Sequence, residues 1–183
     1  MKVLTILAPG FEDLEALGTV ALLRRAGMAV YLCSSDNTEK VTGKYNITVS
    51  SDVLLKDVNV EDYDLLFIPG GMPGVDNLYE NENVRQLVEQ FNAKDKDFAA
   101  ICAAPSILGR MGLLKDKDYT CFPGFEEFAQ DGNYTGNNVT LAPKVITGKA
   151  AGSVHDFALA IIERYLGKEK MEEVKQDIYY NHQ

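Results

Sequence analysis

The segment Tyr63–Pro69 constrains the fold more than any other part of the sequence, because it is apolar at every position after Asp64. A strand with one solvent-exposed face alternates polar and apolar side chains. A continuous apolar run is instead typical of a strand buried on both faces of a parallel sheet. Parallel strands need crossover connections, which are usually helices. The segment therefore predicts an α/β protein with helices on both faces of its sheet.

The rest of the chain alternates strand and helix patterns, as a doubly wound, mostly parallel sheet requires. Further strands are predicted at Lys2–Ala8, Met28–Ser34, the residues leading into Cys102, Tyr119–Phe122 and Lys144–Thr147. Helices are predicted at Glu12–Ala26, Asn83–Asn92, Pro105–Leu114, the segment from Ser153 to Leu166, and Lys168–Ile178. Residues 39–50 predict a hairpin, and residues 124–143 are rich in turn signals.

Two helices carry more detailed expectations. In the first, four small or apolar residues share a face that we expect to be buried: Leu14, Leu17, Ala21 and Leu22. In the later helix, Ser153 and Asp156 have the spacing of a capping box at the helix start. The chain's two histidines are His155, in the first turn of that helix, and His182, in the C-terminal tail, and surface or helix-cap roles are expected for both.

The composition fits one globular domain over residues 1–183, with 46% hydrophobic and 25% charged residues. A net charge of −9 argues against a nucleic-acid partner, because phosphate binding needs clustered Lys and Arg. No apolar run approaches the roughly 18 residues that span a bilayer, so no membrane partner is expected. The N-terminal apolar segment is too short for a signal peptide.

Three cysteines, Cys33, Cys102 and Cys121, form neither an even disulfide framework nor a C-x-x-C pair. The simplest interpretation is a cytoplasmic protein with free thiols in a reducing compartment. No metal site and no other cofactor is expected.

Cys102 is the main candidate for chemistry. An apolar strand runs directly into it, and the small residues Ala103 and Ala104 follow before Pro105 opens a helix. This strand–Cys–helix order is the pattern of a nucleophile elbow, a sharp turn that exposes a reactive side chain at the top of an α/β sheet. The free N–H groups of the helix start would lower the pKa of the thiol. The alternative is a buried structural cysteine.

Glycines in a second loop could complete the site. Gly70 and Gly71 follow the strand 63–69, and their N–H groups, with that of Ala103, could form an oxyanion or anion pocket. The alternative is that Pro69-Gly70-Gly71 is simply a tight turn.

Glu15 is the candidate acid. It lies one turn into the first helix beside the apolar stripe, where its carboxyl would be partly desolvated. A protonated Glu next to a thiolate donates a hydrogen bond to it, which raises the pKa of the acid and lowers that of the thiol. The helix dipole is enough to explain why Glu12 and Asp13 lie at the helix start, because it stabilises acidic side chains there.

Five segments, in order over nearly the whole chain, resemble the DJ-1/ThiJ/PfpI family. They are Gly10–Glu15, Phe67–Gly71, Ala99–Pro105, Val145–Gly148 and Asp156–Ile162. The similarity is strongest to the branch that holds the parkinsonism-associated protein deglycase and its bacterial relatives. It implies a flavodoxin-like sandwich, usually a homodimer, with a reactive Cys in an elbow hydrogen-bonded to a protonated Glu. Those residues match Cys102 and Glu15, and the pocket glycines match Gly70 and Gly71.

The chain departs from the family pattern near the cysteine. Many members carry a His after the nucleophile or on a nearby strand, where this chain has Ala103 and Phe122. An Arg of the human-like branch corresponds to Tyr45. Without a partner His there is no Cys-His dyad, and no donor is evident for the leaving amine of an amide, so peptidase activity is disfavoured.

Two functions remain open, and they need the same reactive thiol. The first is cofactor-free action on reactive 2-oxoaldehydes or their adducts, of the glyoxalase or deglycase type, by Cys102 with Glu15. The second is an oxidative-stress sensor or chaperone in which a peroxide oxidises Cys102 to the sulfinic acid, without turnover. A protein that has lost its activity is a third possibility, which Phe122 and Tyr45 favour. Cys121 is either a resolving thiol for oxidised Cys102 or part of the core, and Cys33 is interpreted as structural.

Overall fold

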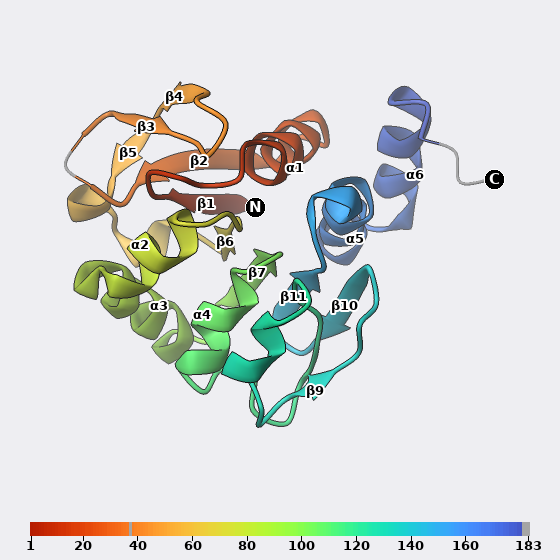
Figure 1. Cartoon of the computed structure of the whole chain (residues 1–183). Coiled ribbons are helices and arrows are strands. Elements are labelled where there is room, and N and C mark those ends of the chain that lie inside the picture. The colour runs from red at the N-terminus through yellow and green to blue at the C-terminus, as the bar shows by residue number, and fades with distance from the viewer. Residues whose placement is uncertain (37, 181–183) are drawn as a thin grey trace.

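A computed structural model, which describes residues 1–36 and 38–180, contains a seven-stranded sheet between two groups of helices (Figure 1). The strand order is β10-β11-β7-β6-β1-β2-β5, and every neighbouring pair is parallel except β10 with β11. The strands are β1 (Lys2–Leu7), β2 (Ala29–Ser34), β5 (Val53–Leu54), β6 (Leu65–Ile68), β7 (Asp97–Ile101), β10 (Val139–Ala142) and β11 (Val145–Gly148). The predicted doubly wound, mostly parallel sheet is confirmed.

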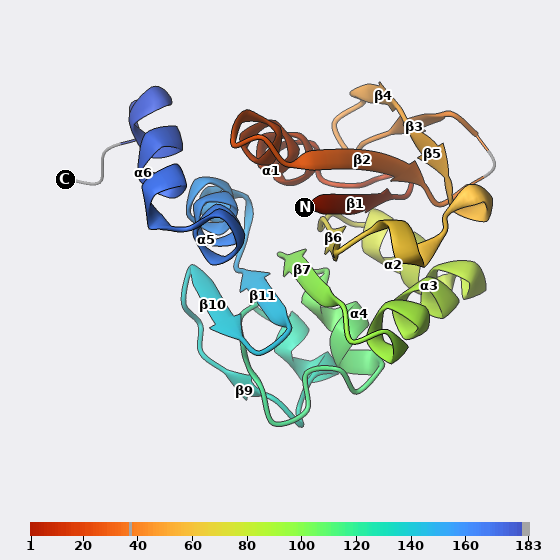
Figure 2. The ribbon, with the colours of Figure 1, turned by 180° about the vertical axis from the view of Figure 1, so that it is seen from behind.

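Helices cover both faces of the sheet, so that each face has its own apolar core. One group packs on one face: α2 (Gly74–Glu80), α3 (Glu82–Ala93) and α4 (Pro105–Arg110). The other face carries α1 (Asp13–Arg25) and α5 (Val154–Leu166). Seen from behind, α6 (Lys168–Asp177) lies at the margin of the molecule beyond α5 (Figure 2). Successive side chains of a strand point to opposite faces, which is why β6 is apolar throughout.

Two small two-stranded sheets lie outside the main one. The hairpin predicted over residues 39–50 is confirmed as β3 (Lys40–Thr42) paired antiparallel with β4 (Thr48–Ser50). In the turn-rich region, β8 (Asp118–Tyr119) pairs parallel with β9 (Asn133–Tyr134). Four short 3-10 helices complete the described elements: η1 (Leu55–Asp57), η2 (Val60–Asp62), η3 (Phe125–Phe128) and η4 (Ala151–Ser153).

The first helix buries a different face from the one predicted. Leu14 is 53% exposed and Ala21 is also exposed, whereas Glu15 and Ala16 point into the protein. The helix turns this way because Glu15 meets the ends of β6 and β7 instead of solvent. Of the predicted stripe, Leu22 is buried.

Three other features differ from the sequence-based expectations: one helix boundary, one additional helix and one helix cap. The helix that opens at Pro105 ends at Arg110, and turns follow in which Gly112 has φ 72°. Helix α2 was not predicted. Ser153 lies just before α5, but its side chain makes no capping hydrogen bond, because the preceding residues form η4 and not an extended entry.

The topology brings three loops together, because β1, β6 and β7 are neighbours in one parallel sheet and end at the same edge. In such sheets, ligands bind beyond the carboxyl ends of the strands. None of the described helices is long and apolar enough to cross a bilayer.

Candidate active site

Cys102 occupies the predicted elbow at the end of β7. Its φ is 64°, in the left-handed region that a non-glycine residue rarely adopts. Its N–H donates to the carbonyl of Gly148 at 2.9 Å, and its own carbonyl accepts from the N–H of Phe122 at 2.8 Å. Helix α4 begins three residues later, at Pro105. Neighbouring backbone on both sides thus holds the thiol in a strained turn, and the side chain is half-buried.

Glu15 lies against Cys102 from the other side of the loop cluster. Its side chain is 1% exposed, it is hydrogen-bonded to the thiol, and its Oε2 accepts the N–H of Gly70 at 3.0 Å. A Cβ at Gly70 would lie 2.5 Å from that oxygen and 2.6 Å from the Cys102 Cβ. Only glycine therefore allows the acid and the thiol to meet here.

Glu12 fixes the first turn of α1, on which Glu15 stands. Its carboxylate accepts the N–H of Glu15 at 2.6 Å, which caps the helix. Its own N–H donates to the carbonyl of Gly70 at 2.8 Å. This second bond ties the start of α1 to the glycine loop, so that Glu15 and Gly70 keep their relative position.

Burial is the main cause that raises the pKa of Glu15, from 4.5 to about 7, and the charge of Glu12 acts in the same direction. Hydrogen bonds from Cys102 and Gly70, and the charge of Lys44, lower the pKa of this carboxyl by less. The expected rise in the pKa of Glu15 is confirmed. An acid with a pKa near 7 can both accept and give a proton at neutral pH.

The expected fall in the pKa of Cys102 is wrong in direction. Burial raises the pKa of the thiol, and the charge of ionised Glu15 adds to the rise. The N–H groups of Ala103 and Gly71 oppose this without reversing it. Helix α4 has six residues, so its dipole is small. The thiol and the acid form a coupled pair that shares one proton when the acid is ionised.

The three N–H groups predicted to form an anion pocket divide between the thiol and Glu15. The backbone N–H groups of Gly71 and Ala103 lie close enough to the Cys102 sulfur to lower the pKa of its thiol. The N–H of Gly70 does not join them, because Glu15 already accepts it. Gly71 has φ 97°, and a Cβ there would lie 2.3 Å from the N atom of Glu12.

The three other predicted site residues lie at different depths. Phe122 is 44% exposed and adjacent to the elbow through its backbone bond to Cys102. Cys121 is fully buried in the core beyond the end of β8, and burial raises the pKa of its thiol to about 12. Tyr45 is 62% exposed on the β3–β4 turn, where its N–H donates to Asp13.

Residues that the sequence did not single out support this site. Phe125 is half-buried and packs its ring against that of Phe122, with the centroids 6.4 Å apart. Gly148, at the end of β11, accepts the N–H of Cys102. The spacing of Phe122 and Phe125 in the sequence could have indicated a local aromatic contact, but no local signal pairs Gly148 with Cys102.

The histidines do not form part of this arrangement. His155 is exposed on α5 and stacks on the ring of Tyr180 with the centroids 4.7 Å apart. His182 lies outside the described residues. Within residues 1–36 and 38–180, no group of three His, Cys, Asp or Glu side chains is placed to hold a metal ion.

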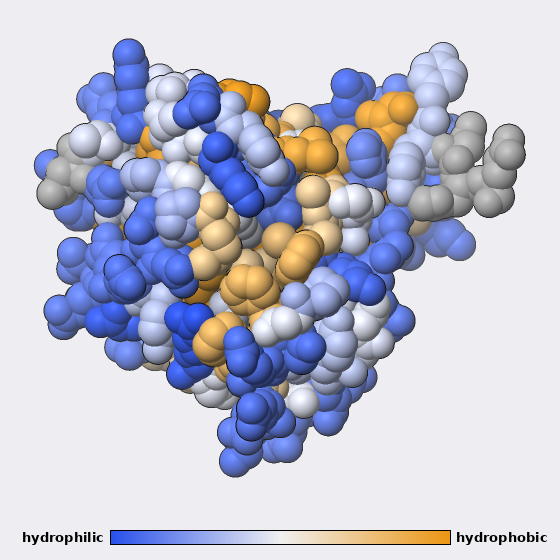
Figure 3. All heavy atoms as spheres, viewed as in Figure 1, coloured by the Kyte–Doolittle hydropathy of each residue, from blue (hydrophilic) through white to orange (hydrophobic). Residues whose placement is uncertain are grey.

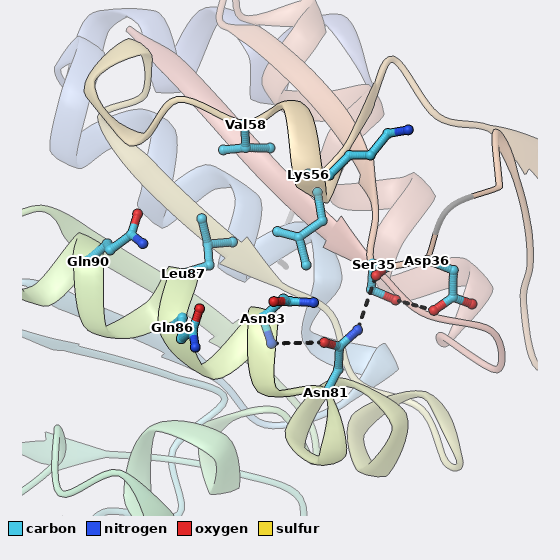
Figure 4. Close-up of a pocket in the computed structure, with 10 residues that line it drawn as sticks. Ser35, Asp36, Lys56, Val58, Asn81, Asn83, Gln86, Leu87 and Gln90 are labelled. Carbon is cyan, nitrogen blue, oxygen red and sulfur yellow. Dashed lines mark hydrogen bonds between the residues drawn. The ribbon is translucent and has the colours of Figure 1, made fainter.

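Two further hollows lie away from the elbow. A polar cavity of about 430 Å³ opens between the end of β2, η1 and α3, where Asn81 donates to the carbonyl of Ser35 and accepts the N–H of Asn83 (Figure 4). An apolar groove of about 440 Å³ runs along α1 and is lined in part by Leu14, Tyr45 and Ile47. Apolar residues also gather over the middle of the face shown in Figure 3.

Known proteins resemble this chain in both sequence and fold. A model of the DJ-1/PfpI family matches residues 1–164. The glutathione-independent glyoxalase DJR-1.2 of Caenorhabditis elegans is 33% identical over 87% of this chain and 85% of that protein. The DJ-1 homolog B of Arabidopsis thaliana is 34% identical over 94% of this chain and 40% of that protein.

The chain spans less than half the length of the two matched Arabidopsis relatives, homologs A and B. Among solved structures, a cysteine-to-alanine mutant of a DJ-1 superfamily protein from Salmonella typhimurium has a TM-score of 0.93 and 33% identity. That alignment covers 99% of both chains.

Proposed function

Since this chain belongs to the DJ-1/PfpI family, we propose that it is a stress-response enzyme acting on small 2-oxoaldehydes or their adducts. The nucleophile is Cys102, Glu15 is the acid and base, and no cofactor takes part. The observation that carries the proposal is the buried contact of Glu15 with a thiol that also faces two backbone N–H groups. The glyoxalase among the relatives supports the choice of substrate.

The proposed reaction begins when the sulfur attacks the aldehyde carbon and the thiol proton passes to ionised Glu15. The carbonyl electrons move to the aldehyde oxygen, which the N–H groups of Gly71 and Ala103 stabilise before Glu15 protonates it. The product of this step is a hemithioacetal. The pKa of Glu15, about 7, lets one carboxyl accept and return the proton at neutral pH.

Glu15 then removes the proton from the former aldehyde carbon and returns a proton to the neighbouring ketone carbon, while the hydroxyl proton of the hemithioacetal passes to the former ketone oxygen. The aldehyde carbon is thereby oxidised to a thioester and the ketone carbon is reduced to an alcohol. Water hydrolyses the thioester, which releases a 2-hydroxycarboxylate and the free thiol. The two carbons exchange oxidation states within one molecule, so the reaction needs no external oxidant or reductant.

The test is turnover of methylglyoxal to lactate by the whole chain and by Cys102→Ser. We expect the variant to lose activity by at least about 100-fold, because the covalent step requires the sulfur. Cys33→Ser is the matched control, since it removes a buried thiol on β2, a strand that is not a neighbour of β7. Full activity in Cys102→Ser would exclude the proposal.

The second candidate function is an oxidative-stress sensor. It is favoured by the same N–H groups of Gly71 and Ala103, which could bind the oxygens of a sulfinate on Cys102. Two successive peroxide molecules would each transfer one oxygen to the sulfur and leave as water. Mass spectrometry after mild peroxide treatment should then find two added oxygens on Cys102. Oxidation confined to Cys33 or Cys121 would contradict this function.

We also propose that the chain forms a homodimer in the cytoplasm and that α1 lies at the interface. Leu14, Tyr45 and Ile47 are 53%, 62% and 49% exposed around one apolar groove, and a second copy would cover them. Sedimentation equilibrium of Leu14→Asp should give a monomer. Leu141→Asp is the matched control, because Leu141 is equally exposed on β10. Equal effects of both substitutions would remove α1 from the interface.

A further inference from the structure

A row of three phenylalanines begins at Phe122, the residue whose backbone is bonded to the Cys102 elbow. Phe122, Phe125 and Phe128 follow one another over η3, with ring centroids 6.4 Å apart for the first pair and 6.1 Å for the second. The first contact is edge-on and the second tilted, both of which are favourable arrangements for aromatic rings. We call these residues the phenylalanine row.

The row is anchored directly to the elbow. The N–H of Phe122 donates to the carbonyl of Cys102 at 2.8 Å, so Phe122 cannot move away without breaking a backbone bond to the nucleophile. At the far end, the Arg110 guanidinium stacks on the ring of Phe128 at 3.9 Å. The backbone is therefore held at Phe122 and the ring is held at Phe128.

The exposed end of the row is the end that is bonded to the elbow. Phe122 is 44% exposed, whereas Phe125 and Phe128 are half-buried. Solvation of a large apolar ring is unfavourable, and a ring held in place loses little further freedom when a ligand covers it. Phe125 also packs against the apolar core cluster on this face of the sheet, which holds the middle of the row in place.

We propose that the phenylalanine row makes this site selective for 2-oxoaldehydes that carry an aryl or other bulky apolar substituent, in preference to methylglyoxal. This inference rests on the proposed function and names the substrate class of the same site. The aldehyde carbon would lie at the sulfur and the substituent against the ring of Phe122. A phenyl ring neither donates nor accepts a proton, so Glu15 remains the acid and base of the proposed reaction.

The first experiment compares kcat/KM for phenylglyoxal with kcat/KM for methylglyoxal. We expect the ratio to favour phenylglyoxal and to fall about tenfold in Phe122→Ala, the size expected for a lost aromatic contact together with its buried area. Phe122→Tyr should retain the ratio, because it keeps the ring. Leu141→Ala, an exposed apolar truncation on β10, should also retain it. A ratio that is the same in the protein and in Phe122→Ala would overturn the inference.

The second experiment measures selectivity without turnover. Cys102 is alkylated with iodoacetamide and with N-phenyl iodoacetamide, and Cys102→Ser reports labelling of the other thiols. We expect Cys102 to be alkylated faster by the phenyl reagent than by iodoacetamide. In Phe122→Ala the two rates should be similar. If this pattern holds but neither aldehyde is converted, the proposed function fails and aryl selectivity stands. If aldehydes are converted but Phe122→Ala does not change the relative alkylation rates, aryl selectivity fails and the proposed function stands.

Discussion

The two ends of strand β7 carry carboxyl groups in opposite electrostatic settings. At its start, Asp97 accepts the Tyr165 hydroxyl at 2.5 Å and lies 3.5 Å from the Lys144 amine and 3.8 Å from the Arg164 guanidinium. Beyond its other end, Glu15 is buried beside a thiol and a peptide N–H, and the charge of Lys44 has the weakest of the influences on its pKa.

This difference separates a carboxyl that supports the fold from one that can take part in chemistry. Cations and a hydroxyl satisfy the charge of Asp97, so this group ties β7 to β11 and α5. Burial without a close cation penalises the charge of Glu15, and its pKa rises to about 7. The same strand thus has a stabilised ion at one end and an exchangeable proton at the other.

The largest expected effect comes from Glu15→Gln, which removes the titrating group and keeps its shape. Turnover of 2-oxoaldehydes should fall about 100- to 10,000-fold, the range for loss of a general acid and base. Alkylation of Cys102 at pH 8 should become faster, because the charge that raises the pKa of the thiol is gone. Iodoacetamide kinetics followed by mass spectrometry measure this rate. If alkylation and turnover fall together, Glu15 does not act as described.

The second effect is a pH dependence of stability. Folded Glu15 holds its proton more tightly than in the unfolded chain, so its contribution is fully present below pH 4.5 and is lost as pH rises through about 7. A rise from 4.5 to about 7 corresponds to about 3 kcal/mol of unfolding free energy. Urea titrations between pH 4.5 and 8 should show a smaller decline in Glu15→Gln. Parallel curves for the two proteins would contradict the burial effect.

The third effect is a loss of stability at the opposite end of β7. Asp97→Asn leaves the Arg164 guanidinium without this carboxylate and weakens the contact with Tyr165, while Lys144 keeps its 3.0 Å pair with Asp95. We expect the free energy of unfolding to fall by about 2 kcal/mol, typical for loss of charge-assisted hydrogen bonds at a partly buried site. Urea unfolding measures this. Turnover should change less than twofold, and a large loss of turnover would refute the division between the two ends.

The smallest effect is expected for Tyr165→Phe, which removes the hydroxyl and keeps the ring. Asp97 retains its two cations, so the loss should be about 1 kcal/mol, the net value of one hydrogen bond. Thermal unfolding at pH 7 measures it. A loss larger than that of Asp97→Asn would mean that the hydroxyl, and not the ion pairs, holds this end of the strand.

Sequence patterns predicted the sheet and the elbow because both depend on local periodicity. Leu65 to Ile68 are apolar at every position, and the two core clusters take alternate residues of this strand. The strand that leads into Cys102 and the small residues after it are enough to indicate the turn. Boundaries were less accurate where tertiary contacts decide them, as at the end of α4.

Glu15 lies beside Cys102, where it was expected, although the reasoning about its helix was wrong. The apolar stripe that includes Leu14 predicted the inward face, yet Leu14 is exposed and Glu15 is buried. Periodicity cannot distinguish an apolar face that meets the core from one that meets solvent. The contacts of Glu15 with Gly70 and Cys102 join residues 55 and 87 positions apart in the sequence, and a single sequence contains no direct record of such pairs.

Cys102 stands at φ 64°, which glycine adopts freely and which disfavours other residues by about 1–2 kcal/mol. Cys102→Gly would relieve this strain but would also remove the nucleophile and its packing against the core. Selection for thermal tolerance alone therefore gives this strained cysteine no advantage. A screen that keeps this cysteine must select for its chemistry at every round.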